Sequence, residues 1–214
     1  MPSAAFLRRL GLFLAPDFLD PDLVATLRDE MRSAPAERAT VLRSDGTDHL
    51  DEEIRRVHST MLGREIRAVV RARFVALIPQ LEQHFQTALA GCEPPLYFLY
   101  REGDYFRPHT DRAATASQHE TRHRRVSAVV FLNRESPQPD AGTYGCGRLT
   151  IYGLLEGPPW NQCGFPVSAS SGLLVAFPSD RLHEVTPVSH GERLTVVTWY
   201  FGPSDDPDRR AELR

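Results

Sequence analysis

The sequence predicts a mainly β protein with flanking helices (α+β), built as a β-sandwich or a double-sheet jelly roll. Beyond residue 95, short segments rich in Val, Ile, Thr and aromatic residues alternate with turns of Gly, Pro and Ser. Before residue 95, apolar residues recur at helical spacing, so we expect helices that pack along the outside of one sheet. The 214 residues fit a single domain with a buried core.

In the N-terminal third of the chain, the sequence predicts short strands and a helix. Residues 6–15 form an apolar segment that we interpret as the first strand. A helix is expected to begin at Asp20-Pro21, because Asp is a good N-cap and Pro is tolerated at the first helical position. Residues 39–43 predict a further strand, and the polar, Gly-containing stretch 44–54 predicts a loop.

A long helical pattern follows over residues 63–90. Pro79 lies inside this pattern and cannot continue the hydrogen-bond ladder, so we expect a break or kink with a second helix beside it. These helices belong to the supporting region 1–94, which we assign to the same domain as a β core at residues 95–202. The charged tail at residues 203–214 is expected to be loose.

The β core contains six predicted strands, each bounded by turn residues. They lie at residues 96–100, 125–132, 148–152, 172–177, 184–188 and 194–201. Many short antiparallel strands within about a hundred residues are typical of a sandwich or a jelly roll.

Charge and cysteine content narrow the range of partners. A net charge of −3 and a pI near 6.2 give no broad basic field, so nucleic acid is not expected as a partner. The three cysteines lack the pattern of a disulfide framework, which favours a reducing compartment. The apolar run after Arg8-Arg9 is too short for a secretory signal or a membrane span. We therefore expect a cytoplasmic protein without a membrane partner, and its oligomeric state stays open.

A histidine and a carboxylate stand close together at His109-x-Asp111. In an extended strand, residues i and i+2 point to the same face, so both can reach one metal ion. His183 lies between two predicted strands, and Arg193 begins the second of them. Two His and one carboxylate on one face of an octahedron suit non-haem Fe(II) enzymes that activate oxygen. An Arg deeper in the same pocket can bind a dicarboxylate co-substrate at two points.

This ordered set resembles the iron(II)/2-oxoglutarate-dependent dioxygenase superfamily and, within it, the prolyl-hydroxylase-like branch. Further segments match that branch in order and approximate spacing. They are Tyr100-x-x-Gly103, the segment from Arg125 to Asn133, Gly147-x-Leu-Thr-Ile-Tyr152, and His183-Glu-Val-x-Pro together with Trp199-Tyr-Phe. The resemblance covers roughly residues 95 to 202 and implies a double-stranded β-helix there.

The resemblance implies roles for the metal and co-substrate residues. His109, Asp111 and His183 would bind Fe(II), and Arg193 would hold the distal carboxylate of 2-oxoglutarate. Relatives of this branch often carry a Tyr at the position of Phe131, and its hydroxyl shares that task.

Phe131 cannot donate such a hydrogen bond. The resemblance therefore leaves the remaining hydrogen bonds to Thr195, Ser127, Tyr100 or water. The expected pocket or substrate side is formed by Phe106, Arg124, Val129, Phe131, Leu149 and Trp199. The loop 44–54 is a candidate segment that closes over the substrate.

The implied activity is hydroxylation of an unactivated C–H bond with Fe(II), 2-oxoglutarate and dioxygen, and with ascorbate as a candidate reductant. The preferred substrate is a prolyl residue in a protein or peptide. Hydroxylation of a free amino acid or other small metabolite is an alternative, because the same core supports it. A non-catalytic β-sandwich binding module is a third hypothesis. A narrow, enclosed pocket would favour a small metabolite, whereas an open groove would favour a peptide.

Overall fold

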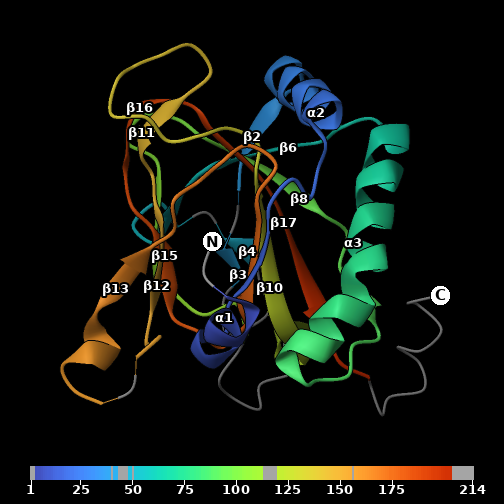
Figure 1. The fold of residues 1–214 in the computed structure, drawn as a ribbon. Coiled ribbons are helices and arrows are strands. Elements are labelled where there is room, and N and C mark those ends of the chain that lie inside the picture. Colours follow the sequence, from blue (N-terminus) through green and yellow to red (C-terminus); the bar gives the residue numbers. More distant parts are fainter. Residues whose placement is uncertain are drawn as a thin grey trace.

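Two β-sheets that face each other form the centre of the protein (Figure 1). The computed structural model describes residues 3–39, 41–42, 48–49, 51–112, 120–155 and 157–203. The larger sheet has eight strands and the smaller one has five, and neighbouring strands run antiparallel. This double-sheet architecture with flanking helices confirms the predicted jelly roll.

The elements have the following bounds. In spatial order, the larger sheet contains β1 (Phe13–Ala15), β14 (Leu174–Pro178), β10 (Arg124–Phe131), β17 (Arg193–Phe201), β8 (Leu96–Tyr100), β6 (His58–Thr60) and β2 (Ala36–Arg38), and β7 (Gly91–Cys92) also pairs with β17. The smaller sheet contains β13 (Gly164–Pro166), β12 (Leu149–Tyr152), β15 (His183–Val185), β9 (Tyr105–His109) and β5 (Arg55–Arg56). Two further pairs are β11 (Tyr144–Cys146) with β16 (Val188–Gly191), and β3 (Val41–Leu42) with β4 (Asp48–His49). The helices are α1 (Ala4–Leu10), α2 (Pro21–Ser33) and α3 (Arg64–Phe85), with short 3-10 turns η1 (Glu120–His123) and η2 (Trp160–Gln162).

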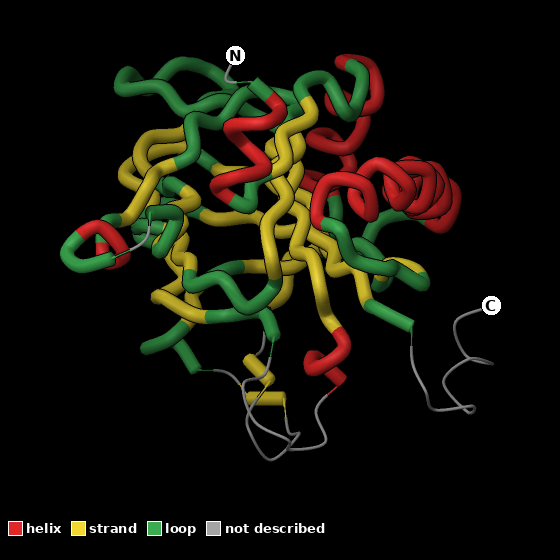
Figure 2. Tube along the Cα trace, turned by 60° about the horizontal axis from the view of Figure 1, so that its bottom comes forward, coloured by secondary structure: helices red, strands yellow, loops and turns green. Residues whose placement is uncertain are grey.

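Helices α2 and α3 cover the outer face of the larger sheet, and the smaller sheet lies on its other face (Figure 1). The turned view again shows the long helix on one side of the strands (Figure 2). Successive side chains of β10 point alternately to the two faces of the larger sheet. Val126 and Val130 pack beneath the helices, whereas Val129 and Phe131 pack toward the smaller sheet. The prediction that the N-terminal helices pack on one sheet is therefore confirmed.

Residues 4–10 fold as α1, so the strand predicted for residues 6–15 is wrong in its first half. The Ser3 side chain accepts a hydrogen bond from the backbone N–H of Phe6, and Gly11 ends the helix with a φ of 68°. Periodicity alone does not separate a short apolar helix from a strand, and here the two caps decide. The helix predicted at Asp20-Pro21 is confirmed, because the Asp20 carboxylate accepts from the N–H of Leu23.

The helix α3 runs through Pro79, so the predicted second helix is wrong. Pro79 has no N–H and leaves the carbonyl four residues earlier without its usual donor. Buried residues before and after it, Phe74 and Leu81, fix the helix on the sheet. The Tyr200 hydroxyl donates to the Phe74 carbonyl at 2.9 Å, close to this gap in the ladder. The ribbon of α3 changes direction in its C-terminal half, in agreement with the expected kink (Figure 1).

All six predicted segments of the β core contain strands, whereas the strands β9, β11 and β13 were not predicted. Within the predicted loop, residues 48–49 form β4, while residues 44–47 and 50 lie outside the described residues, as does the tail from 204 onward. The three cysteines are free thiols. Among the described residues, no helix is both long and apolar enough to cross a membrane.

Gly172 connects the N-terminal segment to the larger sheet. Its N–H donates to the Phe131 carbonyl at 2.8 Å, and its carbonyl accepts from the N–H of Phe18 at 2.9 Å. Its φ is 80°, and a Cβ atom at this position would lie 2.6 Å from the carbonyl oxygen of Leu19. A side chain is therefore excluded both by the backbone conformation and by a contact with rigid backbone.

We predict that Gly172→Ala lowers the free energy of unfolding by about 3 kcal/mol, since the strain of a positive φ adds to the clash. Gly103→Ala is the matched control, because Gly103 has the same φ of 80° and a Cβ there would meet nothing within 4 Å. The control should lose only about 1 kcal/mol. Urea denaturation of both variants measures the difference, and equal losses would contradict the role given to the Leu19 contact.

Candidate active site

Three side chains that can bind a metal converge between the two sheets: His109, Asp111 and His183. The strands β9 and β15 pair with His109 directly opposite His183, and the centroids of the two rings are 4.2 Å apart. The three ligand atoms all lie within 4.8 Å of one another. The structure thus brings the three predicted metal ligands into one cluster.

An irregularity in β9 gives His109 its direction. Between β9 and β15, Phe106 pairs with Val185 and His109 with His183, so β9 has one residue more than its partner over this interval. This β-bulge, at Arg107-Pro108, turns both Phe106 and His109 toward the core, and the missing N–H of a Pro is tolerated there. The Phe106 ring stacks on the His109 ring, with centroids 3.5 Å apart.

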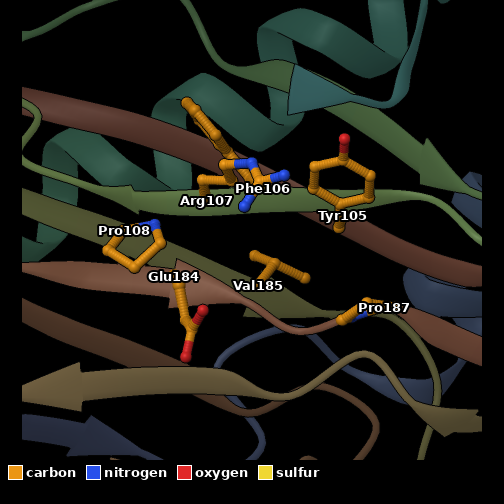
Figure 3. Close-up of a pocket in the computed structure, with 7 residues that line it drawn as sticks. All are labelled: Tyr105, Phe106, Arg107, Pro108, Glu184, Val185 and Pro187. Carbon is orange, nitrogen blue, oxygen red and sulfur yellow. The ribbon is translucent and has the colours of Figure 1, made fainter. Parts of the chain in front are cut away.

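The same strands line a separate surface hollow of about 230 Å³, which is shown in Figure 3. Tyr105, Arg107 and Glu184 contribute to its wall, and none of the three metal-ligand candidates does. In strand β15, Glu184 alternates with the inward-facing His183. Phe106 also lines the hollow and stacks on His109, so the hollow adjoins the metal-ligand cluster without containing any of its three residues.

Asp111 comes from the turn that follows β9 and not from an extended strand, so the strand geometry assumed in the sequence analysis is wrong for this residue. Its N–H donates to the backbone carbonyl of Ser179 at 2.9 Å. Its carboxylate accepts a hydrogen bond of 2.7 Å from the Ser127 hydroxyl, which lies 3.0 Å from the Ser179 hydroxyl. Ser127 within β10 and Ser179 just after β14 thereby fix the carboxylate beneath the two imidazoles.

Hydrogen bonds to the backbone orient both imidazoles. His109 Nδ1 lies 2.8 Å from the carbonyl oxygen of Arg107, and His183 Nδ1 lies 2.8 Å from that of Arg181. A carbonyl oxygen only accepts, so each Nδ1 carries the proton and each Nε2 keeps its lone pair. These Nε2 atoms lie 3.6 Å and 3.4 Å from the Asp111 carboxylate oxygens, which places three lone-pair donors around one point.

The charge states also suit metal binding. Burial acts to raise the pKa of Asp111, but His183, His109 and the Ser127 hydrogen bond outweigh it and hold this pKa well below its usual value. Burial lowers the pKa of His183, with partial opposition from Asp111. At neutral pH the carboxylate is ionised and the imidazole is neutral, which are the forms that bind a metal.

Arg193 is almost completely buried at 1% exposure, at the start of β17. Its guanidinium carbon lies 4.8 Å from the centroid of the Tyr100 ring and 5.2 Å from that of Phe131. Within the described part of the chain, its Nε has no hydrogen-bond partner. A buried cation with an unsatisfied donor suits a carboxylate ligand.

Two more buried polar atoms share this face of β17. The Thr195 hydroxyl and the indole N–H of Trp199 find no hydrogen-bond partner among the residues that the structure describes. Residues 193, 195 and 199 have the same parity, so they project from one face of the strand. Such a row of unsatisfied donors next to a metal-ligand cluster fits a polar co-substrate.

Comparison with known proteins gives the family. A model of the 2OG-Fe(II) oxygenase superfamily matches residues 96–201. The chain belongs to this superfamily. A PKHD-type hydroxylase of Shewanella sp. (strain ANA-3) is 34% identical over 123 residues, which cover 56% of this chain and 48% of that protein. The chain thus spans about half the length of the curated relatives it matches.

Solved structures of related proteins share the fold. A Pseudomonas putida prolyl-4-hydroxylase is 26% identical, with a TM-score of 0.68 over 94% of this chain and 99% of that one. A Trichoplax adhaerens prolyl hydroxylase, solved with a peptide fragment of hypoxia inducible factor, is 18% identical, with a TM-score of 0.67 over 98% and 90% of the two chains. The predicted superfamily and its prolyl-hydroxylase-like branch are therefore confirmed.

The other residues predicted for the site take several positions. Ser127 hydrogen-bonds to Asp111, so its hydroxyl is directed toward the metal ligands instead of Arg193. The ring of Tyr100 lies beneath the Arg193 guanidinium. Val129, Phe131 and Leu149 belong to the apolar cluster between the sheets. This cluster forms a dry wall beside the polar row of β17.

Arg124 and Trp199 form the border of the site. The Arg124 guanidinium lies 3.7 Å from the centroid of the Trp199 ring, and it binds both carboxylate oxygens of Glu93 at 2.6 and 2.7 Å. Its Nη1 also donates to the Asp111 carbonyl at 3.3 Å. These contacts fix Arg124 between the core and the turn that carries Asp111.

Two residues of this site were not found from the sequence. The Arg55 guanidinium lies 4.4 Å from the centroid of the Phe98 ring and 4.7 Å from that of Phe106. Burial lowers the pKa of Arg55, and the charges of Tyr100 and Asp111 oppose this. Tyr144 lies against Arg193, as described below. Both come from short strands that carry no strong β pattern, so sequence spacing gave no signal for them.

We predict that Ser127→Ala weakens Mn(II) binding about tenfold, because the Asp111 carboxylate loses the donor that orients it. Ser136→Ala is the control, since Ser136 is also buried but its hydroxyl contacts Asp140. Calorimetric titration of the metal-free proteins with Mn(II) measures both affinities. Equal affinity of Ser127→Ala and wild type would contradict the orienting role.

Proposed function

We propose that this chain is an Fe(II)- and 2-oxoglutarate-dependent dioxygenase that hydroxylates a prolyl residue in a protein or peptide. The observation that carries the proposal is the combination of two oriented imidazoles, an ionised carboxylate and a buried arginine whose Nε has no hydrogen-bond partner among the described residues, all on the facing sides of the two sheets. A metal site alone has other uses. The arginine adds a specific place for the second carboxylate of a dicarboxylic co-substrate.

His109 and His183 would hold the iron through Nε2, and Asp111 would hold it through its carboxylate. Fe(II) with bound 2-oxoglutarate supplies the activation of dioxygen that breaks an unactivated C–H bond. Arg193 and the Thr195 hydroxyl bind and orient the distal end of the co-substrate. The apolar side chains of Val129, Phe131 and Leu149 keep water away from this end of the pocket.

The substrate would enter past Arg55, Arg124 and Trp199. The Arg55 guanidinium lies over the Phe106 ring, and the Phe106 ring stacks on His109. The Phe106 ring therefore lies in contact with both the Arg55 cation and a proposed metal ligand. A guanidinium in this place can donate to a backbone carbonyl of a peptide and so fix the target residue. The related structures from Pseudomonas putida and Trichoplax adhaerens, both described as prolyl hydroxylases, support a peptide substrate.

We predict that the purified protein, loaded with Fe(II), forms succinate from 2-oxoglutarate in air. His183→Ala should abolish this, since a ligand is lost, and Arg193→Gln should raise KM for 2-oxoglutarate about ten- to a hundredfold, because charged hydrogen bonds are lost. Arg73→Gln, a surface change on α3, should leave both parameters unchanged. Wild type that binds neither Fe(II) nor 2-oxoglutarate would favour a non-catalytic binding module.

A substrate screen separates the two enzymatic alternatives. Proline-containing peptides and free amino acids or small metabolites are incubated with the active enzyme, and mass spectrometry detects the addition of one oxygen atom. Hydroxylation of a prolyl residue, coupled to succinate in equal amounts, supports the proposal. Hydroxylation of the free compounds alone would assign the enzyme to small-metabolite chemistry.

A further inference from the structure

The Arg193 end of the pocket lacks one expected donor. Phe131 lies beside the guanidinium and has no hydroxyl, and the Ser127 hydroxyl is occupied by Asp111. A carboxylate has two oxygens and accepts more hydrogen bonds than one guanidinium edge supplies. A further donor near Arg193 would therefore complete the binding of a distal carboxylate.

Tyr144 lies at this end of the pocket. It is buried on β11 at 1% exposure, and it pairs with Gly191, two residues before Arg193. A Cβ atom at Gly147 would lie 3.2 Å from Cδ of Arg193 and 3.4 Å from Cδ2 of Tyr144, so both side chains meet over this glycine. Tyr144 also packs in one apolar cluster with Tyr100, whose ring lies under Arg193.

Beside Arg193, the hydroxyl of Tyr144 can still act as a hydrogen-bond donor. The two side chains interact electrostatically, and because the Arg193 guanidinium only donates, the phenol oxygen can act toward it only as an acceptor. In this arrangement the phenol proton can be donated to a ligand. Burial raises the pKa of Tyr144, with partial opposition from Arg193, so the phenol keeps its proton at neutral pH.

The backbone around Tyr144 is well fixed. Its carbonyl accepts from the N–H of Ser136 at 2.8 Å, and its N–H donates to the carbonyl of Arg134 at 3.3 Å. Gly147 has a φ of 56°, and a side chain there would also meet Val188 at 2.8 Å. The pair β11 and β16 thus presents the phenol to Arg193 from a fixed position, as a binding site requires.

We propose that Tyr144 is a second binding residue for the distal carboxylate of 2-oxoglutarate, with its phenol donating to the oxygen that Arg193 also holds. The hydroxyl missing at Phe131 on β10 is then supplied from β11. This inference rests on the proposed function, since it concerns the same co-substrate. It makes Tyr144 specific for dicarboxylic 2-oxo acids, because a ligand without the distal carboxylate offers the phenol nothing to bind.

The test is calorimetric binding of two ligands to the Mn(II)-loaded protein. One ligand is 2-oxoglutarate, and the other is 2-oxobutyrate, which keeps the 1-carboxylate and 2-oxo group but lacks the distal carboxylate. We expect Tyr144→Phe to bind 2-oxoglutarate about ten- to a hundredfold more weakly than wild type, and 2-oxobutyrate equally well. The control is Tyr97→Phe, because Tyr97 is a buried tyrosine in the cluster under the helices and its hydroxyl has no partner among the described residues.

The outcomes separate the two proposals. Loss of affinity for 2-oxoglutarate alone supports the inference, with Tyr97→Phe unchanged for both ligands. Equal 2-oxoglutarate affinity in Tyr144→Phe and wild type overturns it, as does an equal loss for both ligands, which would indicate a general structural defect. Wild type that binds Mn(II) but not 2-oxoglutarate would instead refute the proposed co-substrate, whatever Tyr144 does.

Discussion

The buried carboxylate of Asp111 is the group on which the rest of the site depends. A negative charge inside a protein is costly unless it is paired and hydrogen-bonded. Here two imidazole Nε2 atoms, the Ser127 hydroxyl and the turn fixed to Ser179 surround it. The imidazoles turn lone pairs toward the carboxylate, so a cation bound between the three groups would stabilise the cluster. The arrangement therefore fits the metal site that we propose better than it fits a structural ion pair.

The strand β17 joins this metal cluster to the rest of the protein. On one face, Leu194 and Val196 pack into the core beneath the helices, and on the other face Arg193 and Thr195 project toward the pocket. Every residue of the strand is thus constrained by one of two environments. The helices stabilise the sheet, and the apolar cluster lies between the two sheets. The buried polar atoms without a partner among the described residues lie where we propose that a polar ligand binds.

Sequence reasoning found the strands with Val, Ile and aromatic alternation, and it predicted the three residues that cluster between the sheets because their order is distinctive. It failed where the decisive interaction lies outside the local pattern. The caps of α1 override an apolar run, and the bulge at Arg107-Pro108 redirects His109 in a strand that has no β signature. The position of the Ser127 hydroxyl depends on a turn 16 residues earlier in the chain, and Tyr144 meets Arg193 only through the pairing of β11 with β16.

A crystal structure of the protein with Mn(II) and 2-oxoglutarate tests this account most directly. The account predicts one metal ion bound by Nε2 of His109, Nε2 of His183 and the Asp111 carboxylate. It also predicts the distal carboxylate of the ligand on Arg193, with both histidine Nδ1 contacts retained. A metal bound elsewhere, or a ligand whose distal carboxylate lies away from Arg193, would contradict it.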